Sequence, residues 1–148
     1  MTVDGEVVGA IERGALVYVA VGHDDTERDI DYLAGKVLNI RIFPDTEGKM
    51  NLSLLDLRHN GIVHHGTASR PGLLVVSQFT LYGDVRKGRR PSYNDAAPPE
   101  RAVESYERFL AAIEERGIRP ERGTFQEHMD VTYTNDGPVT ILIDTRKE

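Results

Sequence analysis

Three hydrogen-bonding side chains interrupt an otherwise apolar stretch of the sequence. Ser77, Gln78 and Thr80 stand in a run of Leu, Val and Phe that covers residues 73–81. Such a run is typical of a β-strand covered on both faces, and a polar side chain in a buried strand needs a hydrogen-bond partner. Two readings are open: the three side chains bond to a neighbouring loop, or they form part of a site that binds and positions a polar ligand.

A second polar motif lies between two apolar stretches near the C-terminus. Its sequence is Asn135-Asp136-Gly137-Pro138-Val139-Thr140. The ordinary reading is a turn, since Asn, Asp, Gly and Pro are the residues that turns favour. The other reading is a constrained Gly-Pro peptide with a functional role, although only about 5–6% of X-Pro bonds in folded proteins are cis.

A cluster of positive charges follows the first motif, formed by Arg86, Lys87, Arg89 and Arg90. The net charge of the chain is −6, which argues against non-specific coating of nucleic acid. A local basic cluster can still hold one phosphate backbone. We predict contact with nucleic-acid phosphates, and a solvated charged turn is the alternative.

Several common chemistries are excluded by residue type. The chain has no Cys, so it has no disulfide, no Cys-ligated metal and no cysteine nucleophile. Gly83 and Gly88 have the spacing of a phosphate-binding loop, but Arg89-Arg90 stands where Lys-Ser/Thr is required. His59, His64 and His65 lie in one predicted loop without the spacing of metal ligands, which favours a solvated loop. We therefore expect no metal and no organic cofactor.

The chain also lacks the features of membrane and secreted proteins. Its longest apolar run is far shorter than the ~20 residues that a membrane helix needs. The first residues lack the basic and apolar regions of a signal peptide. The sequence predicts a soluble cytoplasmic protein.

The elements that position these motifs follow from periodicity and turn signals. With 148 residues, 39% apolar and 28% charged, we predict a single domain over residues 1–148. Apolar stripes at helical spacing predict two amphipathic helices, at 26–39 and 99–116. Alternation and turn residues predict a hairpin over 2–8, strands at 16–21, 40–43, 50–54, 73–81, 129–134 and 139–143, and a long loop over 58–72. This is an α+β domain, which we expect to be a mainly antiparallel, barrel-like sheet with two helices.

The two polar motifs together resemble a known family. Ser77-Gln78-Phe79-Thr80 and Asn135-Asp136-Gly137-Pro138-Val139-Thr140 are similar to the two signatures of the D-aminoacyl-tRNA deacylases, formerly called D-tyrosyl-tRNA deacylases. The basic segment from Arg86 to Ser92 between them, and Gly48 to Ser53 before them, also look like this family. The resemblance extends from residue 2 almost to the end of the chain.

This resemblance implies a homodimeric hydrolase acting on carboxylic ester bonds. Its substrate would be tRNA that carries a D-amino acid, or glycine on a non-cognate tRNA, at the 3′ end. In the family, a cis Gly-Pro peptide projects from one subunit into the pocket of the other. Carried over, Gly137 and Pro138 bind the α-amino group through their carbonyls and leave no room for an L side chain. No membrane or DNA partner is implied.

Roles for the other residues follow from the same resemblance. The N–H groups around Phe79 and Thr80, beside Ser77 and Gln78, are candidates for stabilising the oxyanion. Thr80 is assigned to positioning, with nucleophile as the lesser option, and the terminal 2′-hydroxyl of the tRNA is thought to assist catalysis. Phe79 and Met129 would line the adenosine side of the pocket, with core packing as the competing reading.

Two departures from the family pattern bear on this assignment. Family members normally have an additional strand before the segment that starts at Thr2, and it carries an Arg that braces the Gly-Pro loop. Here Met1 precedes Thr2 directly, so the bracing Arg has no counterpart in this chain. The loop over 58–72 is also longer than in the family. A catalytically impaired homodimer that binds tRNA or protein is therefore the alternative function.

Overall fold

A parallel pair of strands forms the centre of the protein. The computed structural model describes residues 1–59 and 70–147. Strand β3 (Gly14–Val19) pairs in parallel with β6 (Gly72–Ser77), and β6 pairs in parallel with the short β7 (Glu121–Arg122), giving the order β3-β6-β7. The expected α+β class is confirmed. The expected antiparallel barrel is wrong, because the sheet of the described residues is parallel at its centre and does not close.

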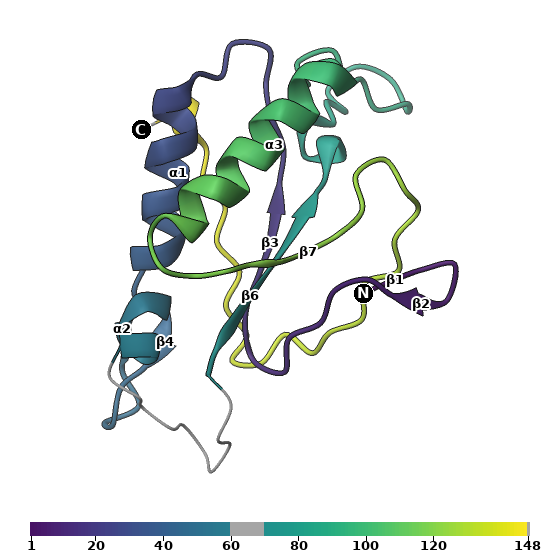
Figure 1. Ribbon diagram of the computed structural model, residues 1–148. Coiled ribbons are helices and arrows are strands. Elements are labelled where there is room, and N and C mark those ends of the chain that lie inside the picture. The colour runs from purple at the N-terminus through teal and green to yellow at the C-terminus, as the bar shows by residue number, and fades with distance from the viewer. Residues whose placement is uncertain (60–69, 148) are drawn as a thin grey trace.

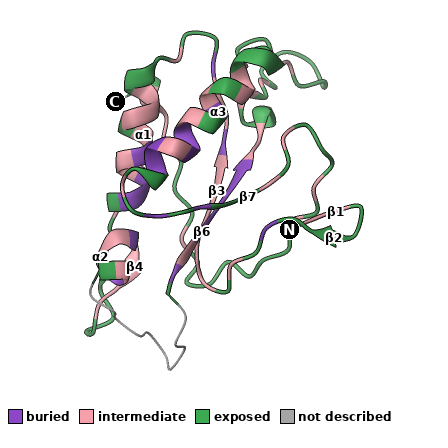
Figure 2. Ribbon diagram, viewed as in Figure 1, coloured by how far each residue is buried: buried purple, intermediate pink, exposed green. Residues whose placement is uncertain are grey.

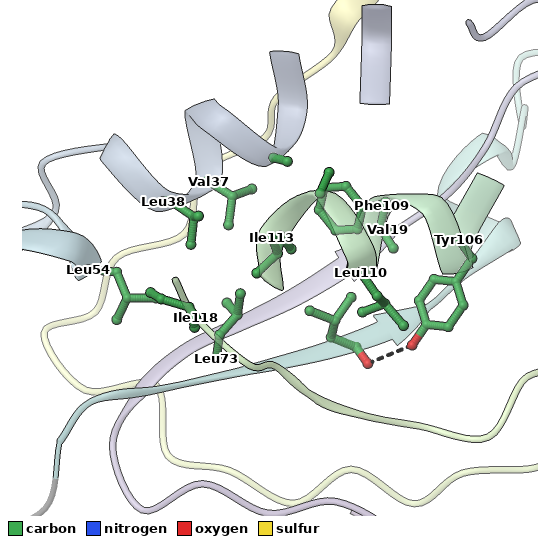
Figure 3. Close-up of a cluster of buried hydrophobic side chains, with 13 residues drawn as sticks. Val19, Val37, Leu38, Leu54, Leu73, Tyr106, Phe109, Leu110, Ile113 and Ile118 are labelled. Carbon is green, nitrogen blue, oxygen red and sulfur yellow. Dashed lines mark hydrogen bonds between the residues drawn. The ribbon is translucent and has the colours of Figure 1, made fainter. Parts of the chain in front are cut away.

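Two helices cover one face of this sheet. Helices α1 (Glu27–Asn39) and α3 (Pro99–Glu114) lie on the same side of the β3–β6 pair (Figure 1). Buried residues concentrate on these helices and on β6 (Figure 2). The apolar core between helices and sheet includes Leu38, Leu73, Val75, Phe109 and Ile113 (Figure 3).

The core also satisfies a backbone group of the central strand. The buried Tyr106 on α3 donates a hydrogen bond of 3.0 Å from its hydroxyl to the Val75 carbonyl of β6 (Figure 3). Burial raises the pKa of Tyr106 to about 12, so the hydroxyl keeps its proton at neutral pH. This bond fixes α3 against the strand that leads to the first polar motif.

The local signals that predicted the two long helices are present in the structure. Thr26 caps α1 in a capping box with Asp29, whose carboxylate accepts hydrogen bonds from the Thr26 backbone and hydroxyl. Proline occupies the first position of α3, and Gly117, with φ +93°, follows its C-terminal turn. Both helices are confirmed, and α3 ends two residues before the predicted boundary.

A third helix, α2 (Leu54–His59), was not predicted. Its signal was present in the sequence, since Ser53 and Asp56 form the same reciprocal cap as Thr26 and Asp29. Apolar and polar residues alternate over 50–54, and this pattern favoured a strand up to Leu54, where the helix begins. The helix occupies the start of the predicted loop over 58–72, most of which lies outside the described residues, as do His64 and His65.

Two short hairpins complete the fold. Strands β1 (Thr2–Val3) and β2 (Glu6–Val7) are antiparallel around Asp4-Gly5, as predicted. The second predicted hairpin is confirmed as β4 (Phe43–Pro44) and β5 (Met50–Leu52), joined by a turn in which Asp45 accepts hydrogen bonds from the N–H groups of Glu47 and Lys49.

The two predicted C-terminal strands, 129–134 and 139–143, are wrong for the structure described. The segment forms no ladder, and its backbone pairing is a single bridge between Asp130 and Thr2. A strand needs a neighbour to accept its hydrogen bonds, and alternation in sequence does not supply one. Consequently Tyr133 and Leu142 are 58% and 79% exposed. The chain then ends in a short 3₁₀ helix, η2 (Thr145–Lys147).

No helix among the described residues is both long and apolar enough to cross a membrane.

Candidate functional site

The first polar motif lies at the carboxyl end of the parallel strand pair. Ser77, the last residue of β6, stands opposite Val19, and the Gln78 N–H donates a hydrogen bond of 2.8 Å to the Val19 carbonyl. The chain then turns into a 3₁₀ helix, η1 (Phe79–Tyr82). The strand predicted over 73–81 therefore ends at Ser77, and the residues after it form a turn above the sheet edge.

Thr80 is exposed at this turn. The Gln78 side-chain amide donates a hydrogen bond of 2.5 Å to the Thr80 hydroxyl oxygen, and the Thr80 carbonyl accepts one of 2.9 Å from the Gly83 N–H. An amide does not take up a proton, so Gln78 cannot activate Thr80 as a general base would. The contact instead fixes the direction of the hydroxyl, whose own proton can still be donated.

Two N–H groups of this turn have no protein acceptor among the described residues. The hydrogen bonds around η1 use the N–H groups of Gln78, Leu81 and Gly83, and none uses that of Phe79 or Thr80. Consecutive unpaired N–H groups at the start of a helical turn can bind a developing negative charge. The side chain of Phe79 is 56% exposed and meets Tyr93 edge to face, with ring centroids 5.1 Å apart.

The basic cluster occupies a closed loop next to this turn. Asp84 and Ser92 exchange two backbone hydrogen bonds, of 2.8 and 2.9 Å, which close the base of the loop. Gly88, with φ +77°, adopts a conformation at its tip that favours glycine. The structure thus brings together the predicted phosphate-binding residues, all exposed: Arg86, Lys87, Arg89 and Arg90.

One of these cations is already paired. Arg86 makes a bidentate salt bridge to Asp84, with N–O distances of 2.9 and 2.8 Å. The guanidinium lowers the pKa of Asp84 to about 2, so the carboxylate is charged at neutral pH. This ion pair was not predicted from the sequence, although Asp84 stands only two residues before Arg86.

The second polar motif lies on the irregular C-terminal segment. Asn135 donates a side-chain hydrogen bond of 3.1 Å to the Thr140 hydroxyl, which closes the turn around Gly137 and Pro138. None of the described peptide bonds is cis, so the cis Gly-Pro peptide implied by the resemblance is absent here. A side chain added at Gly137 would meet only Val139, so this position has room around it within its own chain.

Met129 and the Gly-Pro turn are not brought to η1 within the chain as described. Met129 packs against Gly123, which follows β7. The site predicted from sequence is therefore divided: Ser77 to Thr80 and the basic loop lie together, while Gly137, Pro138 and Met129 have their described contacts elsewhere. In the described part of the chain, no group of three or more His, Asp or Glu side chains could hold a metal ion.

Comparison with known proteins identifies the family. The family described as "D-Tyr-tRNA(Tyr) deacylase" matches residues 1–144. The chain belongs to this family. A "D-aminoacyl-tRNA deacylase" of Thermosipho africanus is 53% identical over 145 residues, covering 98% of this chain and 89% of the relative. One of Koribacter versatilis is 54% identical over 148 residues, covering 100% of this chain and 91% of the relative.

Other members of the deacylase family differ in their described activity. A Bacillus subtilis protein that is 51% identical, covering 97% of this chain and 99% of the relative, is named "Inactive D-aminoacyl-tRNA deacylase". A solved structure described as "c-Myc DNA Unwinding Element Binding Protein" matches with a TM-score of 0.83 and 35% identity, covering 97% of this chain and 90% of that one. The chain therefore shares its fold with this solved structure, and its relatives include deacylases and one protein that is named inactive.

The salt bridge at the base of the basic loop gives a direct prediction. The Asp84 carboxyl should titrate with a midpoint near 2 in an NMR pH titration, because Arg86 stabilises its charged form. Since this folded-state pKa is lowered, the contribution of the pair is complete above about pH 4 and is lost as the pH falls through 2. In Arg86→Ala the midpoint should rise towards 3.8. A midpoint near 3.8 in the unmodified protein contradicts the bidentate geometry.

Proposed function

We propose that this protein hydrolyses the ester bond between a D-amino acid and the 3′ end of tRNA, and acts likewise on glycyl-tRNA mischarged on a non-cognate tRNA. The observation that carries the proposal is the exposed turn at Phe79 and Thr80, with its two unpaired N–H groups, in a chain of the deacylase family. The products are the free D-amino acid and tRNA. The reaction is chiral proofreading if L-aminoacyl-tRNA is spared.

The geometry of the turn suits this chemistry. An aminoacyl ester is already reactive, so placing water and stabilising the tetrahedral oxyanion accelerate the reaction without a strong nucleophile. The N–H groups of Phe79 and Thr80 are the proposed oxyanion donors. The Thr80 hydroxyl, held by Gln78, positions the ester, and the terminal 2′-hydroxyl of the tRNA assists.

Chirality is proposed to depend on the Gly-Pro turn of a second subunit. This proposal is supported by the exposure of Gly137 and Pro138 and by the open space around Gly137, which another subunit could reach. A rigid backbone wall that excludes L side chains works for many amino acids, because it requires no attractive contact with a particular side chain. Met129 and Phe79 are proposed to line the adenosine side of the completed pocket.

Exposed apolar side chains support a homodimer. Tyr133, Ile141 and Leu142, on the same unpaired segment as the Gly-Pro turn, are 58%, 53% and 79% exposed. Contact with a second copy would cover this surface and offer a partner for the unpaired backbone. The same contact would bring one subunit's Gly137 and Pro138 to the other subunit's Thr80.

The basic loop is proposed to hold tRNA phosphates near the acceptor end. Lys87, Arg89 and Arg90 are exposed beside η1, and phosphate contacts set the register of a nucleic acid on a protein. Arg86 contributes less, because Asp84 neutralises it.

A second candidate function is a tRNA- or protein-binding homodimer with impaired catalysis. The observation that favours it is the 51% identical Bacillus subtilis relative that is named inactive. The two functions differ in turnover and not in binding.

The activity is tested with D-Tyr-tRNA and L-Tyr-tRNA side by side. We expect hydrolysis of the D-ester alone, and a fall in kcat of about 10- to 100-fold in Thr80→Ala, because the ester loses its positioning group. Thr46→Ala is the matched control, since it removes an exposed hydroxyl from the distant β4–β5 turn. tRNA binding without any hydrolysis would overturn the deacylase proposal in favour of the binding function.

The shared pocket is tested by mixing subunits. Thr80→Ala and Gly137→Ala should each be impaired alone, since each removes one half of the pocket. Random mixing of the two should restore about a quarter of the intact sites, because half of the dimers are mixed and each of these has one complete site. If both halves came from the same chain, no mixture would exceed the activity of the separate variants.

The basic loop is tested by the salt dependence of binding. Replacing Lys87, Arg89 or Arg90 by Ala should raise the KM for aminoacyl-tRNA and reduce the slope of log K against log salt by about 1 for each lost phosphate contact. kcat should stay within about twofold, because these side chains are proposed to hold phosphates and not the ester. Lys49→Ala, at the distant β4–β5 turn, is the control. Unchanged slopes in all three variants would remove the loop from the tRNA interface.

A further inference from the structure

The side chain of Tyr82 anchors the turn that presents Thr80 to the loop after β3. Of the four residues of η1, Phe79, Thr80 and Leu81 are exposed, and only Tyr82 is partly buried. The Tyr82 hydroxyl lies against Gly22, in the loop that follows β3. Burial and the nearby Asp25 carboxylate raise the pKa of Tyr82, so the ring is neutral at physiological pH. Contacts with the Tyr82 ring therefore help to fix the position of η1.

The C-terminal helix η2 supplies that contact from the far end of the sequence. The Arg146 guanidinium lies over the Tyr82 ring, 5.1 Å from its centroid. Asp144 holds the guanidinium by two hydrogen bonds of 3.0 Å, and its side chain is only 18% exposed. The Arg146 guanidinium thus bonds to the Asp144 carboxylate through its N–H groups and stacks over the face of the Tyr82 ring.

Helix η2 is itself attached to the body of the protein. Thr145 lies close enough to Asp29, the partner of Thr26 in the capping box of α1, to help lower the pKa of that carboxyl, and η2 is in contact with α1. In Figure 1 the C-terminus lies beside α1, at the same end of the sheet as η1. A continuous series of contacts therefore connects the α1 cap, through η2 and Arg146, to the residue two positions after Thr80.

We propose that Arg146, oriented by Asp144, is a positioning residue for the deacylation site, acting through Tyr82 on the Thr80 turn. The inference rests on the proposed function for its kinetic consequence, but the contact itself can be tested separately. The residues that touch substrate are Thr80 and the N–H groups of Phe79 and Thr80, whereas Arg146 acts by restricting the motion of η1. The C-terminal segment that carries the Gly-Pro turn thereby also stabilises the Thr80 turn of its own chain.

The kinetic test compares Arg146→Ala with Arg146→Lys and Tyr82→Leu. We expect kcat for D-Tyr-tRNA to fall about 10-fold in Arg146→Ala with KM within about twofold, because a displaced turn misaligns the ester without weakening tRNA binding. Arg146→Lys, which keeps the cation, should recover part of the loss. The double variant Arg146→Ala/Tyr82→Leu should be no slower than the worse single variant, since both remove one contact.

Lys147→Ala is the matched control, because Lys147 is an exposed cation on the same short helix that also pairs with Asp144, at 3.7 Å, but does not lie over the Tyr82 ring. A raised KM with unchanged kcat in Arg146→Ala, together with a lower salt slope, would make Arg146 a tRNA phosphate contact and overturn the proposal. Additive losses in the double variant would overturn it as well.

A second measurement does not depend on activity. Amide hydrogen exchange at Leu81 and Gly83, whose N–H groups are hydrogen-bonded in the turn, should become several-fold faster in Arg146→Ala than in Lys147→Ala, with the same thermal midpoint in both variants. Tyr82→Phe, which keeps the ring, should exchange like the unmodified protein. Equal exchange in all variants overturns the proposal, whereas absence of turnover in the unmodified protein with faster exchange in Arg146→Ala refutes only the deacylase function.

Discussion

The parallel pairing of β3 and β6 is the constraint on which the rest of the structure depends. Six residues of each strand stand in register, from Gly14 opposite Gly72 to Val19 opposite Ser77. Parallel strands require a covered crossover, and the crossover here contains α1, the β4–β5 hairpin and α2. Because both strands end at the same edge, Gln78 can bond to Val19 and the chain turns there, which places Thr80 above the sheet.

Burial divides the residues of these strands by face. Leu73 and Val75 pack against the helices, while Leu74 and Tyr18 face the opposite side. There Gly9 lies against Leu74, and the nearby Tyr133 adds to the burial that raises the pKa of Tyr18. The helical side is a dense apolar core. The opposite side is covered by irregular segments from both ends of the chain, and the exposed Tyr133, Ile141 and Leu142 belong to the C-terminal one of these segments.

The sequence predicted the local elements better than their assembly. The capping box at Thr26 and Asp29 and the Asp4-Gly5 turn depend on residues close together in the chain, so pattern alone located them. The parallel pairing was missed because strand direction depends on which segments meet, and β3 and β6 are separated by more than fifty residues. The predicted strands at 129–134 and 139–143 failed for the same reason, since their pairing partner is not supplied by their own sequence.

The candidate site shows the same division. The motif at Ser77 to Thr80 and the basic loop are continuous in sequence, and the structure brings them together. Gly137 and Pro138 were connected with Thr80 only through family resemblance, and no described contact within the chain joins them. The role of Arg146 was not visible in the sequence, because its contact with Tyr82 spans most of the second half of the chain.

The central claim is that the turn at Phe79 and Thr80 binds the ester-bearing end of a D-aminoacyl-tRNA. It is tested most directly by NMR titration with 3′-(D-tyrosylamino)-3′-deoxyadenosine, an amide that mimics the substrate but is hydrolysed far more slowly, and with its L isomer. The account predicts that the D compound shifts the amide signals of Phe79, Thr80 and Gly137, and that the L compound leaves all three unchanged. Binding of both isomers alike, or binding that leaves the signals of Phe79 and Thr80 unchanged, would contradict it.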